Sequence, residues 1–146
     1  MKFDSTPQQE CYQKIAAWMD DLFADIPWEE LDEPGFGLFM GSAWVEIRIL
    51  PWEDDTIVNT RSYVVSDASL DVDLLKFLLH KNAEMTFGAF SLDGDGCIRF
   101  EHTIVGSTCD PEELEASAIA VLEIADEYDD WIVERWGGKR ALDRPI

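Results

Sequence analysis

The chain has 146 residues, and its 31 acidic residues against 11 basic ones give a formal net charge of -20 at pH 7. A chain of this length fits one domain with a sizeable core, and a hydrophobic content of 47% excludes a disordered protein. The negative charge repels phosphate backbones and anionic lipid, which argues against nucleic acid and membrane surfaces as partners. We expect a single cytoplasmic domain over residues 1–146, since the sequence shows neither a signal-peptide core nor a membrane-spanning run.

The first predicted element is a helix. Thr6, Pro7 and Gln9 fit an N-cap, a first-turn proline and a capping-box glutamine. Two apolar rows at helical spacing follow, and Pro27 ends the helix near Ile26 because proline cannot continue it.

Three strand-like runs come next, over residues 35–40, 43–50 and 56–65, with a hairpin signal at Gly41-Ser42 and an acidic turn at residues 51–55. Side chains alternate between the two faces of a strand, so the middle run presents one apolar face and one mixed face. The apolar face carries Val45, Ile47 and Ile49, and the mixed face carries Trp44, Glu46, Arg48 and Leu50.

A second helix is predicted from about Ser69 to Lys81, with its apolar stripe at Leu70, Leu74, Phe77 and Leu78. Two strands then flank the sequence DGDG at residues 93–96. The last helix has Asp110 as N-cap and Pro111 at its first position, and Gly137-Gly138 stops it. The order α-βββ-α-ββ-α indicates an α+β domain, in which helices cover one side of an antiparallel or mixed five-stranded sheet.

The DGDG stretch poses the question of a calcium loop. An EF-hand loop aligned on Gly96 would place Ser91 and His102 at the two positions where anchoring carboxylates belong. The flanking residues also favour strands over helices. We therefore interpret Asp93 and Asp95 as turn residues, with Phe90, Leu92, Ile98 and Phe100 as core residues beside them, and weak calcium binding stays open as an alternative.

Acidic residues at positions i and i+4 of predicted helices favour solvated faces over cation sites. The two pairs are Asp21 with Asp25 and Asp126 with Asp130. No cofactor is predicted.

The candidates for nucleophilic catalysis are few. His80 fits a solvated helix surface, and His102, about seven residues before Cys109, fits a half-buried structural histidine better than a Cys-His pair. The three cysteines, Cys11, Cys97 and Cys109, indicate reduced, mostly buried thiols. Because no catalytic or nucleotide-binding motif occurs, we predict no enzyme activity, and an enzyme using His102 or a carboxylate is the least favoured alternative.

The mixed sheet face is the candidate binding surface. Aromatic and arginine side chains on a half-covered face match the composition of protein interfaces. The predicted partner-binding residues are Trp44, Arg48, Trp52, Arg61 and Tyr63, on the side that also carries Asn59. The partner would be a protein client or a second protomer, docked on this face or on the run GFGLFM as an edge strand; alternatively, the first helix or the C-terminal tail covers the face.

Residues 139–146 form a basic tail, and four of the 11 positive charges lie in the last twelve residues. We expect this tail to dock on the acidic body or on a dimer mate.

The arrangement α-βββ-α-ββ-α, together with NAEMTFGAFSLDGDGCIRFEHTIVG, resembles the YbjN-like and type III secretion chaperone-like family. Three stretches are similar to a group of uncharacterised cyanobacterial proteins: ILPWEDDTIVNTRSYVV, FGAFSLDGDGCIRFEHTIVGSTCD and EYDDWIVERWGGKRALDR. In family terms, the recurring elements are the asparagine before the second hairpin and the turn after it, here Asn82, Phe90, Leu92, Asp93, Asp95, Gly96 and Ile98.

The resemblance implies a small, acidic, usually homodimeric protein that binds extended client segments without hydrolysing nucleotide. YbjN-like members are often labelled putative sensory transduction regulators. The resulting prediction is a non-enzymatic, chaperone-like or regulatory protein-binding module; the alternatives are a divalent-cation (calcium) binding protein and an unrecognised enzyme.

Overall fold

Helices and strands account for most of residues 1–144, the part of the chain that this computed structural model describes. The helices are α1 (Thr6–Leu22), α2 (Val72–Glu84), α3 (Pro111–Trp136) and the short 3-10 helix η1 (Ala141–Asp143). The strands are β1 (Trp28–Glu30), β2 (Gly35–Met40), β3 (Ala43–Trp52), β4 (Asp55–Val65), β5 (Ala89–Leu92) and β6 (Ile98–Val105). The predicted α+β class is confirmed.

All strands pair antiparallel in one six-stranded sheet with the order β1-β2-β3-β4-β6-β5. The prediction of five strands was wrong, because the three residues of β1 are too few to show a strand pattern. The pairing of β1 with β2 also corrects the expectation that GFGLFM is an edge strand, since β2 lies between β1 and β3.

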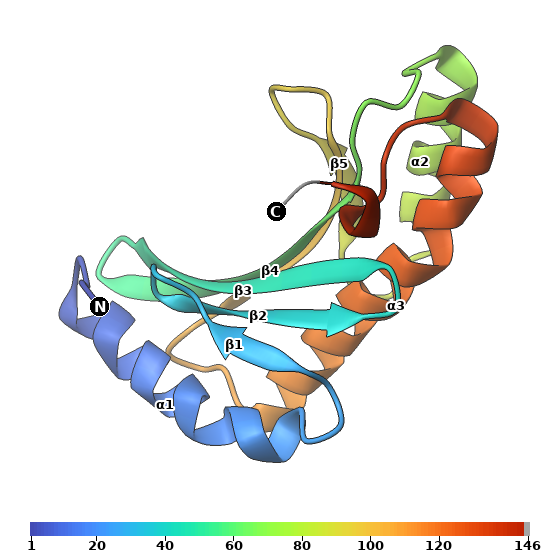
Figure 1. Cartoon of the computed structure of the whole chain (residues 1–146). Coiled ribbons are helices and arrows are strands. Elements are labelled where there is room, and N and C mark those ends of the chain that lie inside the picture. Colours follow the sequence, from blue (N-terminus) through green and yellow to red (C-terminus); the bar gives the residue numbers. More distant parts are fainter. Residues whose placement is uncertain (145–146) are drawn as a thin grey trace.

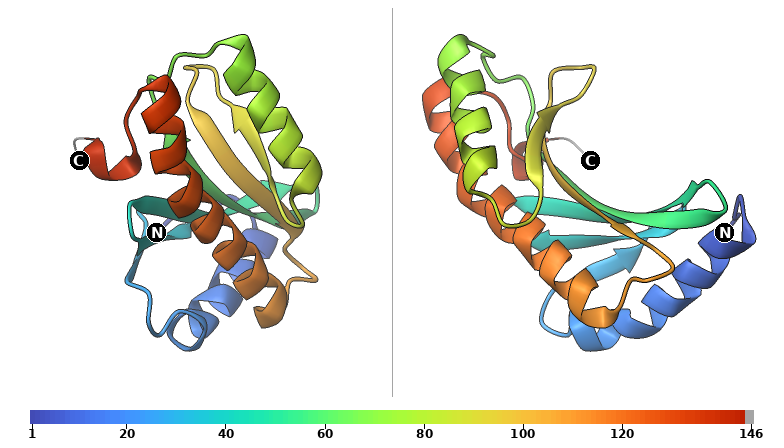
Figure 2. Two further views of the ribbon diagram at one scale, coloured as in Figure 1. Left: turned by 90° about the vertical axis from the view of Figure 1, so that its right-hand side faces the viewer. Right: turned by 180° about the vertical axis from the view of Figure 1, so that it is seen from behind.

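The sheet is covered by α1 and α3 on one face, and it curves so that the opposite face is concave (Figures 1 and 2). The covered face carries Val45, Ile47 and Ile49, which are fully buried. These side chains form one core cluster with apolar residues of α1, such as Ile15 and Met19, and of α3, such as Leu122. Within residues 1–144, no α-helix crosses the concave side, which we call the open face, although the C-terminal segment with η1 approaches it from the end of α3 (Figure 1).

Helix α1 begins one residue earlier than predicted. The N-cap is Ser5, whose hydroxyl accepts a hydrogen bond from the backbone N–H of Gln8 at 3.2 Å. Gln8, and not Gln9, satisfies the backbone nearby, because its side-chain oxygen accepts from the N–H of Asp4 at 2.7 Å. The helix ends at Leu22, before the predicted end near Ile26.

Helix α2 begins at Val72 and not near Ser69, because the side chain of Asp71 caps it by accepting from the backbone N–H of Leu74 at 2.9 Å. Leu70 therefore lies outside the helix and is exposed, whereas Leu74 is buried as predicted. Helix α2 lies beside the C-terminal half of α3 (Figure 2), where Phe77 stacks on Trp131 with ring centroids 4.2 Å apart.

The free edge of β5 is held by one side chain of α2. Asn82 donates from Nδ2 to the carbonyl oxygen of Phe90 at 3.1 Å, and its Oδ1 accepts from the backbone N–H of Phe90 at 2.6 Å. The asparagine thereby occupies the backbone groups with which a further strand would pair.

The turn between β2 and β3 is anchored to α3. Asp126 Oδ1 accepts from the backbone N–H and the hydroxyl of Ser42, at 3.0 Å and 3.1 Å. Asp129, which is buried, accepts from the same hydroxyl at 2.5 Å. Gly41 has φ +58°, and a Cβ there would fall 2.3 Å from the Asp126 carboxylate, so glycine is required. This anchor fixes the end of the sheet where Trp44 begins to project.

Burial raises the pKa of the Asp129 carboxyl, although hydrogen bonds from Ser42 and from the N–H of Asp130 oppose the shift. The folded state therefore binds the proton more tightly than the unfolded chain, and this group's contribution to stability is lost as pH rises through its folded pKa. We therefore predict that the free energy of unfolding of Asp129→Asn, minus that of wild type, becomes more positive as the pH increases. Urea denaturation at several pH values between about 4 and 7 measures it.

The matched control is Glu127→Gln, which removes an exposed carboxylate from the same helix. Its stability curve should keep a constant offset from wild type across this range. A constant offset for Asp129→Asn as well would contradict the prediction.

Candidate functional site

The open face is built from three central strands. Antiparallel pairing places Arg61 of β4 opposite Glu46 of β3 and opposite Glu101 of β6. The predicted binding residues share this face as expected, because they alternate with the buried positions. The polar and aromatic side chains of the face are Trp44, Glu46, Arg48 and Trp52 of β3, Asn59, Arg61 and Tyr63 of β4, and Arg99, Glu101 and Thr103 of β6.

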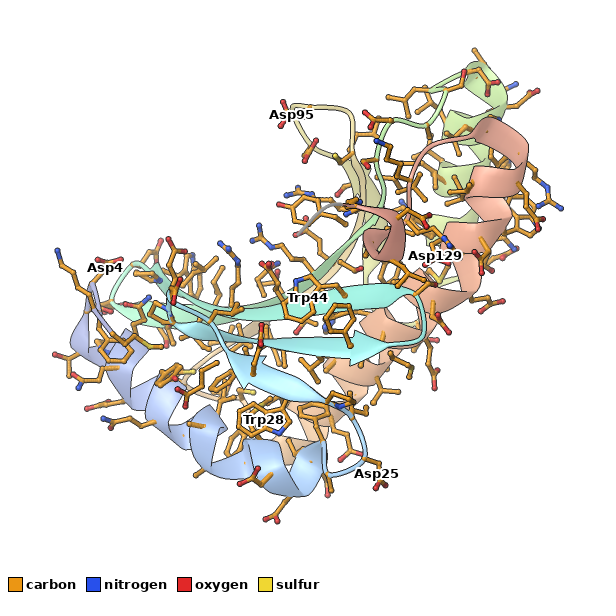
Figure 3. All side chains as sticks on the ribbon, viewed as in Figure 1. Asp4, Asp25, Trp28, Trp44, Asp95 and Asp129 are labelled. Atoms are coloured by element: carbon orange, nitrogen blue, oxygen red, sulfur yellow. The ribbon has the colours of Figure 1, made fainter. Side chains whose placement is uncertain are left out.

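Trp44 forms the aromatic part of the face and lies above the strands on the concave side (Figure 3). Its ring packs against Phe39 with centroids 4.6 Å apart. It also lies against Gly37, where an added Cβ would fall 2.0 Å from the nearest ring atom. Glycine at this position of β2 thus leaves the space that the indole fills.

The carboxylate of Glu46 is bound from both sides along its own strand. Its Oε1 accepts from the indole N–H of Trp44 at 3.3 Å, and its Oε2 accepts from Arg48 Nε at 2.8 Å. Arg48 also lies 3.7 Å from Glu33, a residue of the loop before β2. Both arginine contacts are partly exposed, so each contributes modestly to stability.

Glu101 is engaged in the same way by other residues. Asn59 donates from Nδ2 to Glu101 Oε2 at 3.2 Å and to the hydroxyl of Thr103 at 2.9 Å. Arg99 donates to the other oxygen of Glu101 at 3.4 Å. Both carboxylates that flank Arg61 are therefore already bound to neighbours.

Arg61 consequently differs from the other arginines of the face. Its Nε donates to Asn59 Oδ1 at 2.6 Å, and within residues 1–144 it forms no ion pair. Its two terminal amino groups have no hydrogen bond to the described part of the chain. Up to four N–H donors thus point from a half-buried position toward the concave side.

The predicted residues do not all lie together. Trp44, Arg48 and Arg61 form one group, and Tyr63 lies one further step along β4. Trp52, which is 45% exposed, is eight residues from Trp44 on the same strand, a span of about 26 Å at roughly 3.3 Å per residue. The open face is therefore an elongated surface and not a compact pocket.

A groove beside Arg48 was missed by sequence reasoning. It has a volume of about 590 Å³ and lies between the N-terminal segment, the loop after β1 and strand β3. Its wall includes Lys2, Gln8, Leu31, Glu33, Arg48 and Leu50. No sequence pattern joins these segments, so the groove becomes visible only when the chain is folded.

The C-terminal tail, as far as Arg144, folds back onto its own domain, which is one of the two outcomes expected from its charge. Backbone hydrogen bonds join Ser66 and Lys139 in both directions, at 2.9 Å and 2.8 Å. Arg144 donates to the carbonyl oxygen of Tyr63 at 2.5 Å, and η1 contacts β3 and β4. Residues 145–146 of the predicted tail lie outside the described residues.

The histidine and cysteine candidates form no pair. His102 Nδ1 lies 2.8 Å from the hydroxyl of Ser117, a buried residue of α3, and desolvation lowers the pKa of the imidazole. Cys109 is buried next to the carbonyl oxygen of Asp110, and burial raises the pKa of its thiol to about 11. His102 is half-buried, as expected, and its hydrogen-bond partner is Ser117 and not Cys109.

The DGDG stretch is the turn between β5 and β6, with Asp95 at its tip (Figure 3). Asp93 Oδ1 accepts from the backbone N–H groups of Asp95 and Cys97, both at 2.9 Å, and Gly96 has φ +80°. Both aspartates act as turn residues, as predicted. Leu92, expected in the core, is 39% exposed because it lies next to the turn. Among the described residues, no three acidic, histidine or cysteine side chains are placed to hold a metal ion.

Solved structures share this fold. The chain superimposes on a structure of the ExsC-ExsE complex with a TM-score of 0.62 and 15% identity, over 86% of this chain and 95% of that one. A HopA1-SchA chaperone-effector complex matches with a TM-score of 0.60 and 10% identity, over 83% and 97%. YbjN, a putative transcription regulator from E. coli, matches with 0.54 and 14%, over 82% and 92%. At these identities the likeness defines the fold, that of secretion chaperones and YbjN.

The sequence itself identifies the family. Residues 10–144 match the family TY-Chap1, described as T3SS (YopN, CesT) and YbjN peptide-binding chaperone 1. The chain belongs to this family. No protein with a curated description matches the sequence, and no helix of the described residues is long and apolar enough to cross a membrane.

The packing of Trp44 over Gly37 can be tested by adding one methyl group. We predict that Gly37→Ala displaces the indole and destabilises the protein by about 1–3 kcal/mol, because the ring is held by Phe39 and Glu46. Chemical denaturation measures the loss. The control is Gly94→Ala, where an added Cβ meets nothing within 4 Å, and equal stability of the two variants would contradict the prediction.

Proposed function

We propose that this protein binds an extended segment of a client protein along the open face of its sheet. The observation that carries the proposal is that helices cover one face of the sheet, while the other presents aromatic and arginine side chains, including Arg61 with free donors. Interfaces are enriched in these residue types. The client-binding residues proposed are Trp44, Arg48, Trp52, Arg61 and Tyr63.

The dimensions of the face suit an extended chain. An extended segment of eight residues matches the distance of about 26 Å between Trp44 and Trp52. The indoles at either end provide apolar contact, and the amino groups of Arg61 can donate to carbonyl oxygens of the client's backbone. Recognition of a backbone together with a few side chains is how sheets commonly bind peptides.

The comparisons support a binding role. The family is described as one of peptide-binding chaperones, and two of the similar structures are complexes, one of them described as chaperone and effector. We propose that the protein acts without catalysis, since the hydroxyl nearest His102 belongs to the buried Ser117. We also propose that it is located in the cytoplasm, where cysteines stay reduced, since Cys11, Cys97 and Cys109 form no disulfide.

We further propose that the protein is a homodimer that associates through α2. Val72, Leu75 and Leu79 follow one side of this helix and are 64%, 37% and 70% exposed. Leu70 and Phe87, which precede and follow α2, are also exposed. A row of this kind stabilises an association between helices when it meets a like row on a second copy.

The client-binding proposal predicts that Arg48→Ala with Arg61→Ala weakens peptide binding at least about tenfold, or about 1.4 kcal/mol. The probe is the tightest peptide selected by the full chain from a random library of ten-residue segments, and fluorescence anisotropy gives the affinity. The control combines Lys81→Ala with Arg135→Ala, which removes the same charge from the helical side. Failure to select any peptide, or equal affinity of both variants, would overturn the proposal.

The dimer proposal predicts that Leu75→Glu with Leu79→Glu gives a monomer, because charged residues replace apolar contacts. Light scattering after size exclusion should give twice the chain mass of 16.6 kDa for wild type and a single mass for the variant. The control is His80→Glu, which adds an acid to another side of α2. A monomeric wild type would contradict the proposal.

A further inference from the structure

On the open face, the C-terminal tail lies along the part of β4 that is not paired with β3. Pairing of β3 with β4 ends at Glu46 and Arg61, whereas β4 continues to Val65 and is paired there with β6 alone. Lys139 forms an antiparallel bridge with Ser66 just beyond β4, and Arg144 reaches the carbonyl oxygen of Tyr63. The tail thus lies along the edge that β3 leaves unpaired (Figure 1).

The surface on which the tail docks, which we call its seat, is acidic. Arg140 forms an ion pair with Asp130 of α3 at 2.6 Å. Arg144 forms no ion pair within the described chain, but Asp67 and Asp129 of the body and Asp143 of the tail are near enough to act on it electrostatically. If the tail leaves, Asp130 loses its ion-pair partner, Asp67 loses a nearby positive charge, and the backbone groups of Ser66 lose their partners.

The tail is held weakly for a segment with such contacts. No residue of η1 is buried, and Leu142 is 61% exposed, so little apolar surface stabilises the docked state. The ion pair between Arg140 and Asp130 is exposed, and such pairs contribute about 0–1 kcal/mol. Arg144 is partly desolvated, its Nε has no partner in the described chain, and burial lowers the pKa of its guanidinium.

We propose that residues 139–144 stand in the place of a client, and that the client segment is basic and displaces them. An arriving segment would pair with Ser66 as a short strand and place its cations near Asp67 and Asp130. This inference rests on the proposed function, because it assigns the chemistry of the client at one end of the same face. The apparent affinity for the client is the intrinsic affinity multiplied by the fraction of molecules in which the tail is undocked.

The experiment uses the full chain and a labelled peptide with the sequence of residues 137–144, GGKRALDR. Arg140→Ala with Arg144→Ala weakens the docking of the chain's own tail, so that its seat becomes free for the peptide. Fluorescence anisotropy should show the peptide binding this variant at least about tenfold more tightly than wild type. Lys81→Ala with Arg135→Ala removes the same charge elsewhere and should bind as wild type does. A peptide with its three cations replaced by glutamate should not bind.

A second measurement leaves the wild-type chain unaltered and therefore does not depend on the stability of a variant. Hydrogen exchange by NMR follows the amides of Ser66 and Lys139, which bond to each other's carbonyl oxygens. Excess peptide should expose the amide of Lys139 while that of Ser66 stays protected, because the peptide replaces one partner only.

Equal peptide affinity of wild type and the tail variant, binding of the glutamate peptide, or protection of both amides in excess peptide would overturn the inference. Conversion of a dimer into monomers by the peptide would also overturn it, because the tail would then bridge two protomers. If library peptides lose affinity in the Arg48 and Arg61 variant but bind the tail variant no more tightly than they bind wild type, the proposed function stands and this inference fails. If no library peptide binds either chain, the proposed function itself fails.

Discussion

Strict alternation along β3 is the constraint from which the rest of the structure follows. Val45, Ile47 and Ile49 are fully buried, so the residues between them must project to the other side. A shift of one residue in register would bring Glu46 and Arg48 into the core at a cost of several kcal/mol. The cover of helices on one face and the polar, aromatic surface on the other are therefore two results of one pattern, and the hairpin anchored by Ser42 keeps both in register.

The open face is stable without a partner because most of its polar groups bind one another. Glu46 and Glu101 are engaged by Trp44, Arg48, Asn59 and Arg99, which leaves the amino groups of Arg61 free. An unsatisfied arginine remains tolerable where water reaches it, and its donors gain a partner only on binding. At the tail, one amino group of Arg144 donates to the backbone oxygens of Tyr63 and Lys139, whereas its Nε has no partner in the described chain.

Much of the fold was readable in the sequence, since the runs 35–40 and 43–50, the Asp110 cap and the Gly137 stop depend on local patterns. The short strand β1 could not be predicted, because three residues carry no periodicity. The predicted start positions of α1 and α2 were wrong because neighbouring polar residues compete to cap these helices. The alternation of side chains along the strands predicted that Trp44, Arg48 and Arg61 share one face. The free donors of Arg61 could not be predicted, since its choice of partner among Glu46, Asn59 and Glu101 depends on geometry across three strands.

The clamp of Asn82 on Phe90 has a consequence for growth of the sheet. Two outer strands flank this sheet, and exposed edges invite stacking of further chains into fibrils. At β5 the amide of Asn82 occupies the outward backbone groups of Phe90, while β1 is only three residues long and carries Glu29 and Glu30. An edge covered by an amide on one side of the sheet, and a short, negatively charged edge on the other, are poor templates for the addition of a further chain.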